Sequence, residues 1–242
     1  MGFKLEKVIP WGRSRDEYVK MFDLKPDDLR LNILDCAGGP ASFNAEMNHQ
    51  GYKVISCDPV YQFSAAEIAQ RIEETYQTVI DGVKETWENF VWQDIQSPEH
   101  LGQIRMTAMQ QFLEDLPLGI QQGRYIISEL PTLPFDTGQF DLALCSHLLF
   151  TYSDILSQDF HLTSIQELCR VATEVRIFPL LNNFSKEVSS VLPLVMKDLT
   201  AQGYNLEIKQ VAYEFQKGGN QMLRVWRKKS PESPEEVKPL VN

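Results

Sequence analysis

Short apolar runs alternate with helical segments along this chain, and the alternation constrains the fold more than any other feature of the sequence. The runs of strand length cover residues 31–34, 54–57, 125–127, 140–145 and 174–178. Stretches with helical spacing of apolar residues lie between most of them. Since parallel neighbours in a sheet need long crossovers, usually helices, this order predicts an α/β fold with a doubly wound, Rossmann-like and mostly parallel sheet.

Helix boundaries are marked by capping residues. Ser14 and Glu17 have the spacing of a capping box, in which each side chain binds the backbone N–H of the other residue. Ser97, followed by proline, is typical of a second helix start. We predict two further helices, over residues 164–171 and 188–202.

The pattern in the last part of the chain predicts two strands that run antiparallel to each other. Apolar residues alternate over residues 206–215 and again over 221–226, with Gly218 and Gly219 between the two runs. This pattern is typical of a β-hairpin. We therefore expect one antiparallel strand in the sheet, followed by a mobile tail over the Pro-, Glu- and Lys-rich residues 228–242.

A long insertion is expected after the second strand. The stretch from Asp58 to Arg124 is about five times the dozen residues that a crossover needs. Apolar residues recur in it at helical spacing: Ile68, Ile72, Tyr76, Val79 and Val83, then Leu101, Ile104, Ala108 and Phe112. We predict a helical cap over residues 63–122, inserted into a single domain that covers residues 1–242.

Composition argues against several classes of function. The net charge of −10 argues against a nucleic-acid partner, which usually meets a basic face. No window approaches the ~18 apolar residues of a membrane span, and the first ten residues lack the apolar core of a signal peptide. We expect a cytoplasmic protein with reduced thiols.

The four cysteines show no metal-ligand spacing, so no metal site is predicted. They are Cys36, Cys57, Cys145 and Cys169. Three of them fall at predicted strand ends, which would suit a catalytic thiol. Buried cysteine is more often a small, inert apolar residue, and we favour that interpretation.

The candidate site lies where the strands end. Ligands of doubly wound sheets bind beyond the carboxyl ends of the strands. Gly38 and Gly39 follow the first strand and let a ligand approach the backbone closely. Asp58 follows the second strand, about 20 residues further on, where a carboxylate can accept hydrogen bonds from ribose hydroxyls. Glu129 follows the third strand and could accept a hydrogen bond from an adenine amine.

This ordered set resembles the class I S-adenosylmethionine-dependent methyltransferases, from about Leu31 to Trp226 with the insertion excluded. The matching segments are residues 33–39 for the first motif, Asp58 for the acid after the second strand, residues 129–136 with 140–142 for the adenine segment and the next strand, and residues 167–171 for the helix before the fifth strand. The chain departs from the family at Ala37 and Ala41, where glycine is common, and it lacks the Pro-Gly-Gly before the fifth strand.

The resemblance implies S-adenosylmethionine as the cofactor and in-line methyl transfer to a small-molecule acceptor beneath the cap. Asp35, Gly38 and Gly39 would face the amino acid part of the cofactor, Asp58 the ribose, and Glu129 with Leu130 the adenine. The full set of implied cofactor residues is Asp35, Ala37, Gly38, Gly39, Pro40, Asp58, Pro59, Glu129, Leu130 and Ser146.

Four residues are candidates for the acceptor side. His147 follows the fourth strand, where it could face the transferring methyl group and act as a base. A lone histidine is also often structural. Trp11, Tyr18 and Tyr152 could line the acceptor pocket, and core packing explains them equally well.

Other functions remain open at this stage. A protein or RNA methyltransferase would be favoured by a basic strip beside residues 145–152. A non-catalytic S-adenosylmethionine-binding partner subunit would bind the cofactor without an acceptor pocket. A nicotinamide dehydrogenase fits least, because the glycine spacing after the first strand and the final hairpin both depart from that class. The sequence names neither the acceptor nor the oligomeric state.

Overall fold

A seven-stranded sheet forms the centre of the computed structural model, which describes residues 4–5, 9–183 and 187–227. The strand order is β3-β2-β1-β4-β5-β7-β6. Strands β1 to β5 are parallel, and β7 pairs antiparallel with both β5 and β6. The strands are β1 (Ile33–Cys36), β2 (Val54–Cys57), β3 (Tyr125–Ile126), β4 (Phe140–Ser146), β5 (Ala172–Phe178), β6 (Tyr204–Gln210) and β7 (Gln221–Arg227). The doubly wound sheet with a C-terminal antiparallel hairpin is therefore confirmed; the predicted tail over residues 228–242 lies outside the described residues.

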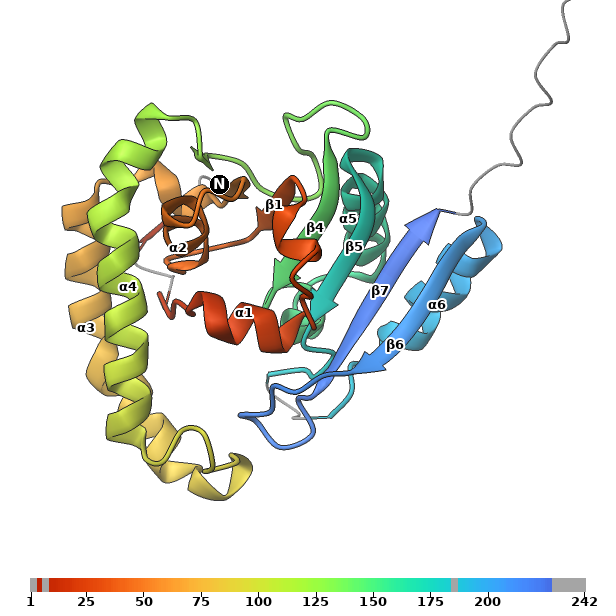
Figure 1. Cartoon of the computed structure of the whole chain (residues 1–242). Helices are drawn as coiled ribbons and strands as arrows, with labels where there is room; N and C mark the ends of the chain where they lie inside the picture. The colour runs from red at the N-terminus through yellow and green to blue at the C-terminus, as the bar shows by residue number, and fades with distance from the viewer. Residues whose placement is uncertain (1–3, 6–8, 184–186, 228–242) are drawn as a thin grey trace, which may run out of the picture.

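Helices cover both faces of this sheet (Figure 1). The helices are α1 (Arg15–Met21), α2 (Phe43–His49), α3 (Ala65–Glu85), α4 (Pro98–Gln121), α5 (Gln158–Val171) and α6 (Leu192–Ala201). Alternate strand residues face opposite layers: Leu34 joins the cluster of α5 and α6, while Ile33 joins that of α1 and α2. The central strands are thus buried on both faces, as expected of a parallel sheet.

The helix starts predicted at Ser14 and Ser97 are confirmed. Ser14 and Glu17 form the capping box of α1, each side chain binding the backbone of the other residue. The Ser97 hydroxyl accepts a hydrogen bond from the His100 N–H at the start of α4. Ser157 caps α5 in the same way, so that helix begins six residues before the expected Ser164.

The insertion after β2 forms the two long helices α3 and α4, which lie side by side beyond the β3 edge of the sheet (Figure 1). Their shared apolar cluster includes Ile68, Ile72 and Phe112, and it reaches Tyr61 and Tyr125 next to the sheet. None of the described helices is long and apolar enough to cross a bilayer.

The structure corrects three further boundaries. The third strand ends at Ile126 rather than at residue 127, and the helix expected at 188 begins at Leu192. Strand β6 ends at Gln210 rather than at residue 215. The alternation beyond Gln210 has another cause, because the Phe215 ring leaves the sheet and stacks on Phe90 with a centroid distance of 4.7 Å.

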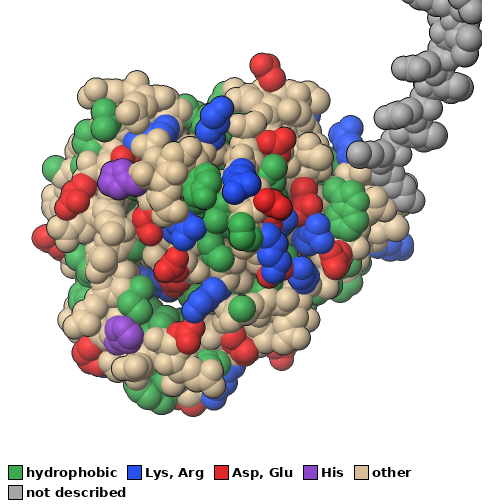
Figure 2. All heavy atoms as spheres, viewed as in Figure 1, with side chains coloured by type: hydrophobic (Ala, Val, Ile, Leu, Met, Phe, Trp, Pro, Cys, Tyr) green, Lys and Arg blue, Asp and Glu red, His purple; other side chains and the backbone are tan. Residues whose placement is uncertain are grey.

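Charges of both signs are mixed on one face of the molecule. On the face of the described chain that Figure 2 shows, Lys and Arg side chains lie among Asp and Glu side chains and do not gather into a basic strip. This distribution agrees with the acidic composition of the whole chain.

Candidate functional site

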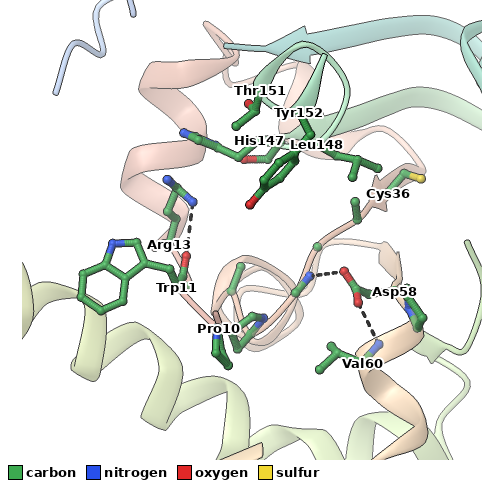
Figure 3. Close-up of a pocket in the computed structure, with 18 of the residues that line it drawn as sticks. Pro10, Trp11, Arg13, Cys36, Asp58, Val60, His147, Leu148, Thr151 and Tyr152 are labelled. Atoms are coloured by element: carbon green, nitrogen blue, oxygen red, sulfur yellow. Dashed lines mark hydrogen bonds between the residues drawn. The ribbon is translucent and has the colours of Figure 1, made fainter. Parts of the chain in front are cut away.

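A cavity of about 840 Å³ opens at the carboxyl ends of β1, β2 and β4. Its walls come from the loops after these strands, from residues 128–130, and from the N-terminal segment of residues 9–13. Figure 3 shows these segments meeting around one hollow. The site expected at the strand ends is therefore a real cavity, and the segment ahead of α1 closes one of its sides.

The loop after β1 has a backbone that glycine makes possible. Gly39 adopts a φ of 53° and Ala37 a φ of 58°, both in the left-handed region. At Gly38 a side-chain Cβ would lie 2.3 Å from Asp35 Oδ2 and 2.9 Å from the Tyr61 hydroxyl. Any larger residue at position 38 would displace one of these groups, so the loop can lie flat along the cavity floor.

Asp58 ties the first two loops together. Its Oδ2 accepts a hydrogen bond from the Gly39 N–H at 3.0 Å, and its Oδ1 accepts one from the Val60 N–H at 2.8 Å (Figure 3). Burial, with a smaller contribution from Glu129, raises the pKa of Asp58 to about 6. Both oxygens keep a further lone pair, so the carboxylate can accept hydrogen bonds from a ligand as well.

Asp35 lies beneath the loop rather than in the cavity wall. Its Oδ1 accepts a hydrogen bond from the Tyr18 hydroxyl at 3.1 Å, and its Oδ2 accepts one from the Ser56 hydroxyl at 2.9 Å. Burial raises the pKa of Asp35 to about 7. Tyr18 does line the cavity, and its ring stacks on Phe43. Asp35 thus supports Gly38 and Tyr18 from below.

His147 occupies an unusual position after β4. Its φ is 53°, and its backbone N–H donates to the Phe178 carbonyl at 2.7 Å. The Ser146 hydroxyl lies 2.8 Å from its Nδ1. Burial and the nearby cations Arg13 and Arg105 hold the pKa of His147 well below its ordinary value of 6.5. The imidazole is therefore neutral at neutral pH, and a left-handed backbone for a residue other than glycine is typical of functional sites.

The remaining candidates surround the same cavity. The Tyr152 hydroxyl points toward its centre (Figure 3), while the Trp11 indole turns outward and packs near Tyr76 of α3. Every predicted site residue except Asp35 lines the cavity: Trp11, Tyr18, Ala37, Gly38, Gly39, Pro40, Asp58, Pro59, Glu129, Leu130, Ser146, His147 and Tyr152. From the helical pair of the insertion, Val79 is the residue in the lining.

The four cysteines pack in the interior of the fold as thiols. Cys36 lines the cavity, and all four cysteines are buried without a disulfide. A hydrogen bond with Cys57, together with burial, raises the pKa of Cys36 well above its ordinary value. The group at the cavity wall is therefore a thiol rather than a nucleophilic thiolate.

Four polar residues of the wall were not singled out from the sequence: Arg13, Ser128, Thr151 and Asn183. The Arg13 Nη1 donates to the Trp11 carbonyl at 3.2 Å, which holds the side chain along the wall (Figure 3). In the sequence, Arg13 could have been found only through its position between Trp11, a predicted site residue, and the capping box of α1. Thr151 follows β4 by five residues and carried no signal of its own.

A buried ion pair stands behind this wall. The Arg105 guanidinium of α4 binds Glu17 of α1, and it also donates to the Tyr213 hydroxyl at 3.2 Å. The Tyr213 hydroxyl in turn donates to Glu17 Oε1 at 3.1 Å. Three segments that are distant in the sequence are thus joined next to residues 9–13.

The strand order β3-β2-β1-β4-β5-β7-β6, with β7 alone antiparallel to its two neighbours, is the fold that the resemblance to the class I S-adenosylmethionine-dependent methyltransferases implies. The chain belongs to the same family as the uncharacterized protein MJ0045 of Methanocaldococcus jannaschii. The two are 34% identical over 224 residues, which make up 92% of this chain and 98% of the relative. No family model matches the chain.

Solved structures with a similar fold include two methyltransferases. Magnesium protoporphyrin IX methyltransferase (ChlM) from Synechocystis PCC 6803, solved with bound SAM, is 12% identical with a TM-score of 0.45; the match covers 88% of this chain and 78% of that one. The 1,6-didemethyltoxoflavin-N1-methyltransferase of Burkholderia thailandensis is also 12% identical, with a TM-score of 0.43, and the match covers 82% of this chain and 71% of that one.

Proposed function

We propose that this protein is an S-adenosylmethionine-dependent methyltransferase that acts on a small-molecule acceptor. The observation that carries the proposal is the position of Asp58, whose carboxylate ends β2, binds the glycine loop and faces a cavity lined by both. A carboxylate there suits the two ribose hydroxyls of a nucleoside. The negative charge of Asp58 also attracts the positively charged sulfonium of S-adenosylmethionine, whereas it would repel the pyrophosphate of a dinucleotide.

The cofactor would lie across the strand ends. Glu129 and Leu130 would border its adenine, Asp58 and Pro59 its ribose, and residues 37–40 its amino acid part, with Ser146 beside them. When bound, the cofactor supplies a methyl group on a sulfonium. The protein's contribution is to hold the acceptor in line with that methyl group, since alignment alone lowers the barrier by several kcal/mol.

We assign to His147 the role of the base, which would receive the proton of an acceptor that carries one. The neutral imidazole offers a lone pair on a ring nitrogen, while Ser146 holds the ring orientation. The transfer then leaves the methylated acceptor, the proton on His147 and S-adenosylhomocysteine. Trp11, Tyr18 and Tyr152 would contact the acceptor.

The acceptor side favours a small molecule. The cavity has the size of a ligand pocket, and its lining includes Tyr152 and Val79 of the insertion helix α3. We propose one domain over residues 1–242, with residues 63–122 as the inserted cap. The four free, buried cysteines and the acidic composition support a cytoplasmic protein.

Calorimetric titration tests the cofactor. We expect micromolar binding of S-adenosylmethionine and S-adenosylhomocysteine and none of NAD. Asp58→Ala should weaken binding by about 1.5–3 kcal/mol, the range for hydrogen bonds to a charged group. Because the pKa of Asp58 is about 6, protonation at lower pH removes acceptor capacity, so the affinity for S-adenosylhomocysteine should fall below pH 6.

A matched control separates the ribose site from a general charge effect. Asp81→Ala removes an exposed carboxylate from α3 and should leave the affinity unchanged. Equal affinities of Asp58→Ala and the wild type would remove Asp58 from the site. Binding of NAD alone would contradict the methyltransferase.

The protonation state of His147 can be tested directly. Its pKa is held low by burial and by two cations, so the ring should remain neutral at pH 6 in the folded protein. Arg13→Gln removes one of these cations and should raise the pKa of His147. Nuclear magnetic resonance of the imidazole protons across pH 4–8 reports both. The assignment of His147 as the base would be contradicted if its pKa were at or above the ordinary value, or if Arg13→Gln left that pKa unchanged.

A further inference from the structure

The cavity wall holds a cation without a counter-charge. Arg13 forms no ion pair within the described part of the chain, and its Nε is buried without a hydrogen-bond partner. Its Nη1 donates to a backbone carbonyl only. Burial and the neighbouring Arg105 cation lower the pKa of Arg13. Arg13 is half-buried, and a cation withdrawn from water is costly unless an opposite charge compensates it, so this position favours an anionic ligand.

The nearest carboxylate does not balance both guanidinium groups. Glu17 also attracts Arg13 electrostatically, but its oxygens bind Arg105, the Tyr213 hydroxyl and the backbone of Ser14. The single negative charge of Glu17 therefore has to compensate the two positive charges of Arg13 and Arg105. His147, the other titratable group on this wall, is neutral and adds no charge. The wall keeps one positive charge in excess.

A second unpaired group lies on the same side of the cavity. Thr151 is 8% exposed, and its hydroxyl has no hydrogen-bond partner among the described residues. Figure 3 shows Thr151, His147 and Arg13 on one side, with Asp58 on the other. A hydroxyl donor and a guanidinium at one end match an oxyanion, whereas the carboxylates Asp58 and Glu129 line the opposite end.

We propose that Arg13 and Thr151 form an oxyanion subsite, and that the methyl acceptor is a small carboxylic acid with an apolar body. The inference rests on the proposed function, because it assigns the acidic end of the cavity to the cofactor. Apolar side chains of the same cavity would receive the body of the acid. These are Leu148, Leu156, Phe160 and the ring of Tyr152.

A pair of isosteres tests the subsite. Benzoate carries the carboxylate and an apolar ring, and benzamide has the same shape without the charge. We expect the protein saturated with S-adenosylhomocysteine to bind benzoate in the millimolar range and benzamide at least tenfold more weakly. Arg13→Gln should weaken benzoate binding at least tenfold and leave benzamide unchanged, and Arg13→Lys should recover part of the loss.

Two further variants complete the design. Thr151→Val removes an unpaired hydroxyl at nearly constant volume, so it should weaken benzoate several-fold without lowering the melting temperature. Arg30→Gln removes an exposed arginine of the Arg30–Asp27 pair and should change neither ligand. Equal binding of benzoate and benzamide by the wild type would overturn the subsite.

The carboxylate of the cofactor is the alternative occupant, and the same variants distinguish it. If Arg13→Gln weakens S-adenosylmethionine but not its decarboxylated analogue, the cofactor's own carboxylate lies on Arg13 and the inference is wrong. If S-adenosylhomocysteine does not bind at all, the proposed function fails instead. Titration of the free protein with benzoate and benzamide then still decides whether Arg13 binds an anion.

Discussion

Replacing Arg105 by methionine is expected to lower the free energy of unfolding by about 3–5 kcal/mol, the range for removing one partner of a buried ion pair. Arg105 is 1% exposed, and its guanidinium compensates the buried carboxylate of Glu17. Without it, Glu17 and the Tyr213 hydroxyl lose their shared partner. Methionine keeps most of the volume, so the loss reports the charge rather than a cavity.

Urea denaturation at pH 7 measures this effect, with two comparisons. Lys84→Met breaks the exposed pair with Glu99 and should leave the stability nearly unchanged. The double variant Arg105→Met with Glu17→Met removes both charges and should be more stable than Arg105→Met alone. A loss below about 1 kcal/mol for Arg105→Met would mean that the pair is not buried as described.

The second large effect is expected at Gly12. A Cβ at this position would lie 2.0 Å from the Pro40 carbonyl oxygen, 2.6 Å from its carbon and 2.9 Å from Met109 Cγ. Two of these atoms are backbone, so Gly12→Ala must displace either residues 9–13 or the glycine loop. We expect a loss of about 1–3 kcal/mol in stability and at least tenfold in affinity for S-adenosylhomocysteine.

Gly82 provides the matched control. It lies within α3, where an added Cβ meets no atom within 4 Å. Gly82→Ala should therefore raise the stability by about 0.5–1 kcal/mol through its helix propensity, with no change in affinity. Thermal melts and calorimetric titration separate the two substitutions. Wild-type affinity in Gly12→Ala would show that this contact does not position the site.

The sheet could be predicted because its determinants are local. A parallel strand buried on both faces reads as a short apolar run, and the capping box at Ser14 marks the start of α1. The end of β6 could not be predicted in this way. Tyr213 and Phe215 continue the alternating pattern, but their partners are Arg105 and Phe90, more than a hundred residues away.

The same contrast between local and distant determinants explains which residues of the site could be predicted. Parallel strands place their carboxyl ends at one edge, so the grouping of Gly39, Asp58 and His147 follows from the strand order. Asp35 was expected in the wall of the cavity, yet it lies beneath the loop. Its carboxylate fits there because Gly38 has no side chain to occupy the same space. Arg13 escaped prediction because its burial depends on packing between the N-terminal segment and the rest of the fold.

The ion pair behind the wall also sets an order of events during synthesis. Glu17 leaves the ribosome 196 residues before Tyr213, an interval on the order of 10 s at cellular translation rates. Until Arg105 and then Tyr213 have emerged, the segment ahead of α1 lacks this support. A nascent chain therefore completes the support of its ligand pocket only after Tyr213 has been made, although residues 9–13 of that pocket are made well before it.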